Sequence, residues 1–389
     1  MPDSSLRILI TCRELAVRAG TQLYTRDVAE ELRRLGHSPV VFSPRLGEVA
    51  AEIRSRGIAV IDSLDRLGEP PDVIHGQHHL EAMQAMLRFP TVPALYVCHG
   101  WLPWQEAPPR FPSLARYVAV DALRRDRLVL EHGIPESHVT VLHNFVDLDR
   151  FRPRPPLPPR PRRALLLSNQ ASARTFVPEI ERACAASGLE LTVAGFAAGR
   201  SIRPEEILAS HDLVFARGRA ALEAMAVGAA VVLCDLEGSG PLVDSSNFDT
   251  LRNLNFGMGA LRPPVEEERL RAAIGRYDPE DAARVRDRVR REAGREEAVE
   301  VLVGLYRELL AMPRADAQDC LRAASLYLSW LGPHTETAED ELARTAAELA
   351  AAQATLQALE RSPFLRLRAS LLGLTPLVAL YRAVKGWSG

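Results

Sequence analysis

The sequence predicts an α/β protein with two consecutive domains. Short apolar runs typical of buried strands alternate with amphipathic helical segments, a pattern that indicates largely parallel sheets. A segment with six prolines interrupts this alternation, which then begins again. The chain has 389 residues, more than one hydrophobic core usually organises, so a second domain is expected on length as well.

The first domain is expected over residues 1–149. Its first strand is predicted at 6–11, and the helix after it, at 21–37, carries apolar residues at helical spacing. Gly36 is a natural C-cap for this helix. Further strands are predicted at 39–44, 58–61, 72–76, 94–100, 117–120 and 139–144, with amphipathic segments such as 121–132 between most of them.

Residues 150–163 are predicted to link the two domains. This segment, RFRPRPPLPPRPRR, holds six prolines, which exclude both a helix and a central strand. A second α/β domain is expected over 164–312, ending in a helix near residue 311. Its strands are predicted at 164–169, 189–195, 212–216 and 230–235.

Residues 313–361 are expected to form a helical or coiled-coil extension. Leu342, Leu349 and Leu356 recur every seven residues, which suits a coiled coil with self-association over 335–360. A single solvated helix is the alternative, and the spacing does not decide between the two.

Residues 362–389 are predicted to lie on a membrane surface. The segment contains leucines, a tyrosine and a tryptophan but no acidic residue, a composition typical of interfacial helices. A helix packed on the protein's own surface is the alternative. The basic residues expected at the membrane are Arg366, Arg368, Arg382 and Lys385, the last being the only lysine in the chain.

Composition narrows the class of protein further. The net charge of -2 gives no reason to expect a nucleic-acid partner. The five cysteines form no CxxC pair and are interpreted as buried thiols in a reducing compartment. No signal peptide is evident, and no apolar stretch approaches the ~18 residues that span a membrane. We therefore expect a cytoplasmic protein that is peripheral at the inner face of the plasma membrane.

Several polar residues and glycines follow predicted strands or begin the next element. In open parallel sheets, ligands bind beyond the carboxyl ends of the strands, so this placement predicts a cleft between the domains. For any single histidine in the set, a structural role is as good an interpretation as a functional one. The residues are Gly20, His75, His99, Asn144, Gly195 and Glu223.

Five motifs, in order, resemble the family-4 type of retaining glycosyltransferases, which have the GT-B fold. The motifs are AGTQLYTRDVAEELRRLGHSPVVFSP, PDVIHGQHH, VPALYVCHG, VTVLHNFVDLDRF and ALEAMAVGAAVVLCDLEGSGPLV, and the resemblance covers roughly residues 6–310. It implies a nucleotide-sugar donor bound mainly by the second domain and an acceptor bound by the first. It also implies retaining transfer without a metal or any further cofactor.

The resemblance also implies roles for particular residues. Glu223 matches the family glutamate that holds the donor ribose, although a capping or salt-bridging glutamate would fit the same position. Gly20 matches the loop that covers the phosphates. His99 matches the histidine near the reaction centre and is the catalytic candidate. Gly238 and Gly240 would let the backbone approach the nucleotide, while His75 and Asn144 are expected on the acceptor side of the cleft.

Two positions depart from the family pattern. The family's first motif glutamate lies eight residues before the second, where this chain has Phe215, or the segment is shortened here. The lysine that the family places on the leaving diphosphate is missing, and arginine is the available substitute. The candidates among the arginines are Arg174, Arg200 and Arg217.

The sequence therefore predicts a glycosyltransferase that moves a sugar from a nucleotide sugar to an envelope or lipid-linked glycan, such as a lipopolysaccharide or O-antigen intermediate. The alternative is a catalytically impaired GT-B scaffold that binds a nucleotide sugar or glycan, which the two departures favour. A nucleotide-sugar epimerase on the same fold fits less well, because it would have no use for a basic apolar tail.

Overall fold

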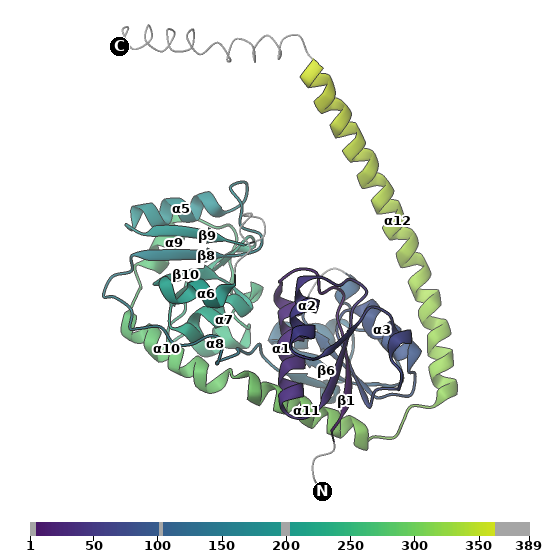
Figure 1. The fold of residues 1–389 in the computed structure, drawn as a ribbon. Helices are drawn as coiled ribbons and strands as arrows, with labels where there is room; N and C mark the ends of the chain where they lie inside the picture. Colours follow the sequence, from purple (N-terminus) through teal and green to yellow (C-terminus); the bar gives the residue numbers. More distant parts are fainter. Residues whose placement is uncertain (1–4, 101–103, 196–202, 362–389) are drawn as a thin grey trace, which may run out of the picture. The chain divides into compact units, whose positions relative to one another are not determined.

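A computed structural model describes residues 5–100, 104–195 and 203–361. It confirms an α/β fold with two β-sheets, each packed against helices (Figure 1). The first sheet has seven strands in the order β3-β2-β1-β4-β5-β6-β7, and every neighbouring pair is parallel. The chain builds outward from β1 in one direction and then returns to add β4 on its other side. The carboxyl ends of β1 and β4 therefore form a topological switch point, the usual ligand position in such sheets.

The helices of the first domain lie between the strands as the periodicity predicts. The strands are β1 Arg7–Thr11, β2 Ser38–Phe42, β3 Ala59–Ile61, β4 Val73–Gly76, β5 Ala94–Cys98, β6 Leu114–Ala119 and β7 Val139–Val141. The helices are α1 Gly20–Arg34, α2 Glu48–Ser55, α3 His79–Arg88 and α4 Ala122–Asp126, with a π-helical turn η3 Arg127–Glu131 and 3-10 turns η1 Leu64–Arg66, η2 Trp104–Glu106 and η4 Glu136–His138.

The second sheet has five strands in the order β12-β11-β10-β8-β9. Four of them are parallel and coincide with the predicted strands; the fifth, β12, pairs antiparallel with β11. The strands are β8 Arg163–Leu167, β9 Glu190–Ala194, β10 Leu213–Ala216, β11 Ala230–Asp235 and β12 Gly238–Leu242. The helices are α5 Val177–Ala186, α6 Pro204–Ile207, α7 Gly218–Val227, α8 Phe248–Asn253, α9 Glu267–Ile274 and α10 Pro279–Glu292, with turns η6 Leu208–Ser210 and η7 Met258–Ala260.

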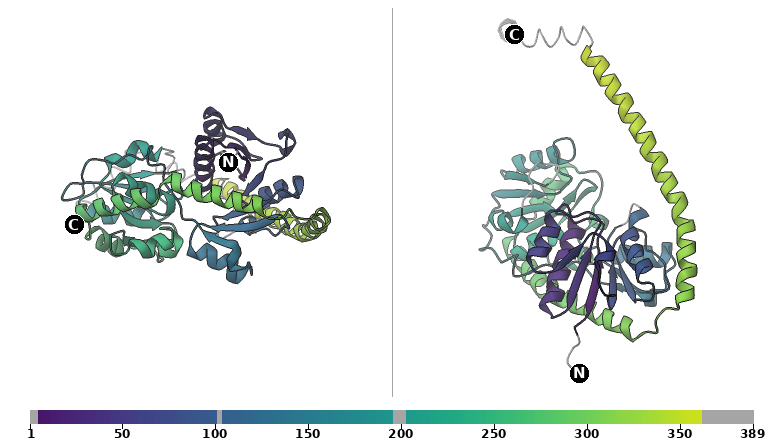
Figure 2. Two further views of the ribbon diagram at one scale, coloured as in Figure 1. Left: turned by 90° about the horizontal axis from the view of Figure 1, so that it is seen from below. Right: turned by 45° about the vertical axis from the view of Figure 1, so that its right-hand side comes forward.

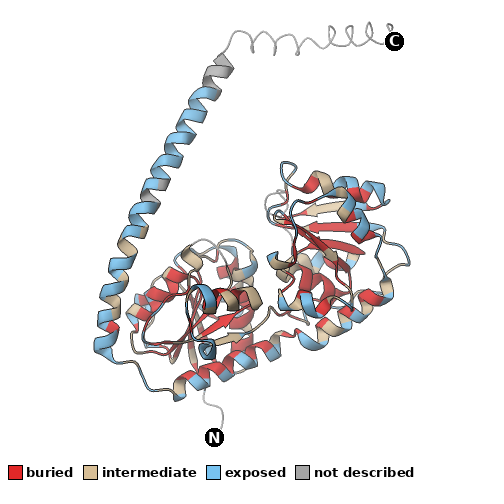
Figure 3. Ribbon diagram, turned by 180° about the vertical axis from the view of Figure 1, so that it is seen from behind, coloured by how far each residue is buried: buried red, intermediate tan, exposed pale blue. Residues whose placement is uncertain are grey.

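Both faces of the second sheet are buried, as the continuous apolar strands predict (Figure 3). Successive residues of a strand point to opposite faces. Val214 and Leu233 accordingly pack with α7 on one face, while Phe215 and Val232 pack with α5 and α9 on the other.

The helix α11, Arg295–Ala311, follows the second domain in the chain but packs on the first (Figure 1, Figure 2). Val299, Leu302, Tyr306 and Leu309 lie in the same buried cluster as the strands and helix α1 of the first domain. The sequence prediction places this helix in the second domain, 164–312, because it follows that domain in the chain. Its packing corrects that placement.

Arg154 of the predicted linker is fixed to the second domain, whereas Arg150 at the start of the linker pairs with Asp27 of the first domain. The Arg154 guanidinium pairs with Asp212 at 2.9 Å, and the Arg154 N–H donates to the carbonyl of Val227. Phe151 is buried in the core of the same domain. The segment is thus neither helix nor strand, as its prolines predict, yet it is held by specific contacts.

The helix α12, Ala317–Arg361, forms the C-terminal extension, and its residues from Arg322 to Arg361 belong to a second unit. Leu342 and Leu349 are 71% and 59% exposed, and the side chain of Leu356 lies outside the described residues. The tail residues Arg366, Arg368, Arg382 and Lys385 also lie outside them. Among the described helices, none combines the length and the apolar character that crossing a membrane would require.

Candidate functional site

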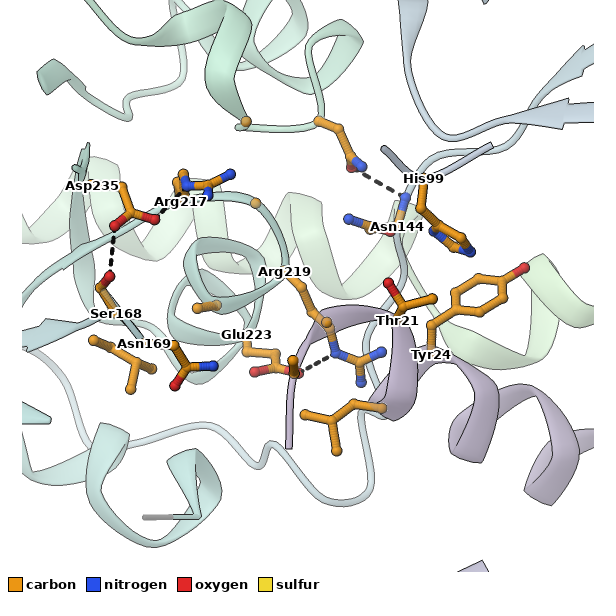
Figure 4. Close-up of a pocket in the computed structure, with 18 of the residues that line it drawn as sticks. Thr21, Tyr24, His99, Asn144, Ser168, Asn169, Arg217, Arg219, Glu223 and Asp235 are labelled. Carbon is orange, nitrogen blue, oxygen red and sulfur yellow. Dashed lines mark hydrogen bonds and ion pairs between the residues drawn. The ribbon is translucent and has the colours of Figure 1, made fainter. Parts of the chain in front are cut away.

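A cavity of about 490 Å³ lies where the carboxyl ends of strands from both sheets meet (Figure 4). From the first domain it is lined by the start of α1 and by residues that follow β5, β6 and β7. From the second it is lined by residues that follow β8, β9 and β10, by Glu223 of α7, and by the end of β11. Asn169 donates a hydrogen bond at 3.3 Å to the carbonyl of Arg18, which joins the two sides.

The N-terminus of α1 opens onto this cavity. Ala19 is the N-cap in extended conformation, no side chain caps the helix, and no acid occupies its first turn. The first hydrogen bond of the helix runs from the Leu23 N–H to the Ala19 carbonyl, so the N–H groups of Gly20 and Thr21 precede it at the cavity wall. Such a helix end suits an anion.

The N-terminus of α7 faces the same cavity from the second domain. β10 ends at Ala216 and α7 begins at Gly218, so Arg217 alone connects strand and helix. Phe215 is a buried strand residue in the sheet core. A glutamate at this position would therefore lie in the sheet core and not at the cavity.

Arg217 is half-buried at the cavity and is held by two acids. Its guanidinium pairs with Asp235 at the end of β11, and Nη2 lies 3.3 Å from Glu237. Asp235 is fixed in turn by Ser168, whose hydroxyl donates to Oδ1 at 2.6 Å. Of the arginine candidates from the sequence, Arg217 is the one that the structure brings to the cavity; Arg174 is exposed outside its lining, and Arg200 lies outside the described residues.

Glu223 lines the cavity and is only 3% exposed. Its Oε1 accepts a hydrogen bond at 2.7 Å from Nε of Arg219, one helical turn earlier on α7. Nη2 of Arg219 pairs with Asp27 of α1, which is fully buried. Glu223 thus forms the salt bridge that is one of the two interpretations of its position, and it also faces the cavity.

Burial and the neighbouring arginines act in opposite directions on the pKa values of Glu223 and Asp27. Burial raises the pKa of Glu223 above its ordinary value, and the Arg219 guanidinium opposes that rise. Burial would also raise the pKa of Asp27, but Arg219 and Arg26 outweigh it, so the pKa of this carboxyl lies below its usual range. Asp27 is thus an ionised anchor for Arg219.

His99 lies at the end of β5 with its ring against Tyr24 of α1, the ring centroids 4.6 Å apart. Its Nε2 is 2.9 Å from Oε1 of Gln77. Burial holds the pKa of His99 well below its usual range, and the neighbouring His78 and His75 lower it further. The imidazole at the cavity is therefore neutral.

Asn144 also reaches the cavity. Its backbone N–H donates to Oδ1 of Asn255 at 3.1 Å, and both asparagines line the cavity. This contact joins the end of the first sheet to the loop after α8 in the second domain.

His75 does not belong to the cavity lining, which corrects its placement in the cleft. Its Nδ1 is 2.7 Å from the hydroxyl of Tyr306 on α11, and its side chain is completely buried. Burial lowers the pKa of His75 to about 3, so the ring is a neutral part of the core. Sequence alone gives His75 and His99 the same position at a strand end, and the packing of α11 separates their roles.

Gly238 and Gly240 also lie outside the cavity lining. A Cβ added to Gly238 would come within 2.5 Å of the Arg262 carbonyl oxygen, and one added to Gly240 within 2.8 Å of the Ala260 oxygen. The two glycines thus allow β12 to pack against the backbone of residues 260–262, which explains them without a nucleotide.

Asp27, Glu30 and Asp147 are the carboxylates that come nearest to a metal-ligand arrangement among the described residues, with oxygens within 4.8 Å of one another. Arg150 and Arg295 lie among them and pair with these oxygens at 2.8–3.5 Å. The guanidinium groups account for the acidic cluster.

Sequence reasoning missed several residues of the cavity. Ser168, Asp121 and Asp235 follow or end predicted strands, so the rule that selected His99 could have found them as well. Gln77 directly follows the predicted strand 72–76 and contacts His99 from outside the cavity lining. Arg219 carries no comparable signal, because its partner Asp27 is far away in the sequence.

Comparison with known proteins agrees with this geometry. Residues 18–150 match the model of Glycosyltransferase Family 4. Over these residues the first domain is similar to family-4 glycosyltransferases. No curated protein matches the chain in sequence.

Solved structures extend the likeness to both sheets. A glycosyltransferase from Rickettsia africae superposes with a TM-score of 0.59 at 16% identity, over 79% of this chain and all of that one. Anabaena Alr3699/HepE in complex with UDP and glucose superposes with a TM-score of 0.55 at 13% identity, over 78% of this chain and all of that one. At these identities the likeness concerns the fold, which is GT-B.

Proposed function

We propose that the chain transfers a sugar from a nucleotide-sugar donor to an acceptor hydroxyl, with the donor in the cavity between the two sheets. One observation carries the proposal: the N-terminus of α1, the Glu223 carboxylate and the neutral His99 all line the same cavity. The helix N-terminus suits the diphosphate of such a donor, the carboxylate suits its ribose diol, and the imidazole suits its sugar.

The proposed placement follows from the chemistry of each group. The N–H groups of Gly20 and Thr21 suit the diphosphate, and the Arg217 side chain is more exposed than those of the other arginines that line the cavity. Glu223 accepts the ribose hydroxyls. Because its ring is neutral, His99 accepts a hydrogen bond from a hydroxyl of the donor sugar and does not deliver a proton.

The reaction needs stabilisation of the leaving group more than a protein base. The bond between the anomeric carbon and the diphosphate oxygen breaks, and the acceptor oxygen bonds to the same carbon. The acceptor proton passes to the departing phosphate. Retention of configuration is proposed from the family resemblance, and helix N–H groups aimed at the leaving oxygen supply the electrostatic part.

The nature of the acceptor is proposed from the C-terminal segments. A basic, aromatic-containing tail after a long helix suits an enzyme that works at a membrane surface on an envelope or lipid-linked glycan. Self-association over 335–360 is proposed with it, because Leu342 and Leu349 are exposed seven residues apart.

A scaffold that binds a nucleotide sugar without transferring it is the second candidate. The position eight residues before Glu223 favours it, because Phe215 there is buried in the sheet core and offers no acid to orient the donor sugar. The carboxylate partners of Arg217 and Arg219 favour it as well, since a diphosphate would have to compete with them.

The test is thermal stability of the full chain against UDP-, GDP-, ADP- and dTDP-sugars, with donor hydrolysis followed in the same samples. UDP-sugars come first because HepE was solved with UDP-glucose in a fold like this one. A nucleotide sugar that stabilises the chain and is slowly hydrolysed supports the transferase. Stabilisation without any cleavage, also with added lipid-linked acceptors, favours the scaffold, and no stabilisation by any nucleotide contradicts both.

A further inference from the structure

Arg219 has a position in the cavity that the family resemblance does not explain. It stands at the first turn of α7, four residues before Glu223, and both side chains line the cavity (Figure 4). Nε of Arg219 donates to Oε1 of Glu223 at 2.7 Å. Oε2 of Glu223 makes no hydrogen bond with the described residues, so one carboxylate oxygen is left for a ligand.

The pair is buried, and this changes its significance. An exposed ion pair at this spacing on a helix contributes little to stability. Here the side chains of Arg219 and Glu223 are 10% and 4% exposed. Removing one partner of a buried pair leaves the other charge uncompensated, so each residue determines the state of the other.

Asp27 fixes the far end of the Arg219 side chain. It lies on α1 in the first domain, and Nη2 of Arg219 pairs with its Oδ2. The other oxygen, Oδ1, pairs with Arg26 at 2.7 Å and with Arg150 at 3.2 Å. Asp27 therefore cannot turn away, and Arg219 is held at both ends by carboxylates of different domains.

We propose that Arg219 is a positioning residue for donor recognition: anchored by Asp27, it keeps the Glu223 carboxylate ionised and turned so that its free oxygen meets the donor ribose. The inference rests on the proposed function, since it takes Glu223 as the ribose ligand. It adds that the first domain contributes to ribose recognition through Asp27, without touching the nucleotide.

The pairing with Arg219 explains how a buried Glu223 can accept hydrogen bonds from ribose hydroxyls. A lone carboxylate in this position would be driven toward its neutral form by burial, and a protonated carboxyl accepts ribose hydroxyls poorly. Two nitrogens of Arg219 are already engaged by carboxylates. Arg219 is for that reason a holder of Glu223 and not the cation that receives the diphosphate.

The experiment measures binding of UDP and of 2′-deoxy-UDP by calorimetry, or of the corresponding pair for whichever nucleotide the panel selects. The variants are Arg219→Met, Arg219→Lys, Glu223→Gln and Asp27→Asn. Arg219→Met leaves Asp27 with Arg26 and Arg150, so the first domain keeps its ion pairs. Arg154→Met is the matched control, because it breaks the buried Arg154–Asp212 pair of the same domain outside the cavity lining.

Arg219→Met is expected to weaken UDP binding about tenfold, the scale for losing a charged hydrogen bond, and to affect 2′-deoxy-UDP less. The preference for the ribose form should shrink as it does in Glu223→Gln. Arg219→Lys should restore part of it. Asp27→Asn should weaken UDP in the same direction and add little in the Arg219→Met background, since the two act through one chain of contacts.

Wild-type UDP affinity and wild-type ribose preference in Arg219→Met would overturn the inference. An equal loss for both nucleotides would overturn it too, because that indicates a general structural effect, as would a similar loss in Arg154→Met. If Arg219→Met does not fold, the preference for UDP over 2′-deoxy-UDP is measured in Arg219→Lys and Asp27→Asn, and it decides the inference in the same way. If the wild-type chain binds no nucleotide, the proposed function fails first, and the inference fails with it.

Discussion

Nε2 of His99 lies 2.9 Å from Oε1 of Gln77, and this contact decides which nitrogen of the imidazole carries the hydrogen. Gln77 donates from Nε2 to the Thr25 hydroxyl at 3.1 Å, and that hydroxyl donates to the Thr21 carbonyl at 2.9 Å. The amide orientation is thus fixed, and its oxygen only accepts. His99 donates from Nε2 and keeps Nδ1 as an acceptor.

We expect Gln77→Leu to slow donor hydrolysis with little change in nucleotide affinity. Without its partner the His99 ring loses its defined tautomer and orientation, and the loss should be about tenfold to a hundredfold in rate, the scale of one buried hydrogen bond. The measurement is the hydrolysis rate at saturating donor beside the Kd of the nucleotide. Gln318→Leu, an exposed glutamine of α12, is the control. A wild-type rate in Gln77→Leu would show that His99 acts without this support.

Acid should destabilise the fold through its buried histidines. Burial lowers the pKa of His75 to about 3 and, together with the charge of Arg13, the pKa of His78 to about 4. An unfolded histidine titrates near 6.5, so below that pH the unfolded chain binds more protons than the folded one. The stabilisation from the two neutral rings is complete above pH ~6.5 and is lost progressively as the pH falls toward 4 and then 3.

Between pH 7 and pH 5 each of the two rings should therefore lower the midpoint of thermal unfolding, contributing up to about 1.4 kcal/mol per pH unit to the slope, whereas Glu106, whose pKa burial raises to about 7, acts in the opposite direction. His75→Gln should flatten this dependence, because glutamine can bond to Tyr306 but does not titrate. His138→Gln removes an exposed histidine and should leave the slope unchanged. An identical slope in His75→Gln and in the wild type would refute the assignment.

Much of this arrangement follows from local patterns. Apolar runs predict the parallel strands, and the rule that ligands lie beyond strand ends selects Gly20, His99, Asn144 and Glu223, which all line the cavity. The same rule cannot separate His75 from His99, because the difference depends on Tyr306, 231 residues further along the chain.

Contacts between distant segments account for what the sequence does not predict. Asp27 and Arg219 are 192 residues apart, and no local sequence pattern at either position predicts their contact. The packing of α11 on the first domain is missed for the same reason. The strand β12 is missed because Gly238, Gly240 and a proline oppose strand propensity, and backbone packing against residues 260–262 overrides it.

Gly20→Ala should reduce nucleotide affinity without reducing stability. No heavy atom lies within 4 Å of a Cβ built on Gly20, and alanine is the better helix former, so the fold accepts the methyl group. The methyl group then occupies the space in which the diphosphate approaches the helix N-terminus. We expect about a tenfold weaker Kd, equivalent to ~1.4 kcal/mol, measured by calorimetry beside the unfolding midpoint. Unchanged affinity would move the diphosphate away from α1.

Gly238→Ala should do the opposite. Its backbone φ is +144°, and the added Cβ would come within 2.5 Å of the Arg262 oxygen, so both strain and a backbone clash oppose the substitution. We expect a loss of about 2–4 kcal/mol in the free energy of unfolding, with nucleotide affinity of the folded fraction unchanged. A stable variant with impaired nucleotide binding would instead return Gly238 to the donor site.

Deleting residues 362–389 should release the chain from anionic vesicles. Four basic residues and no acid occur in this segment, and each cation near an anionic surface contributes about 1 kcal/mol, so attraction should depend on both lipid charge and salt. The measurement is co-sedimentation of the full and truncated chains with phosphatidylglycerol-containing vesicles and with pure phosphatidylcholine vesicles, at low and high salt.

Two controls separate the tail from other causes of sedimentation. The truncated chain should keep the unfolding midpoint of the full chain, which shows that the domains are intact. Replacing Arg366, Arg368, Arg382 and Lys385 by glutamine should weaken binding while retaining the apolar residues, since charge and buried apolar surface act together in interfacial helices. Sedimentation of the truncated chain with anionic vesicles at the level of the full chain would place the membrane contact elsewhere, and α12 with its exposed leucines would then be the next segment to delete.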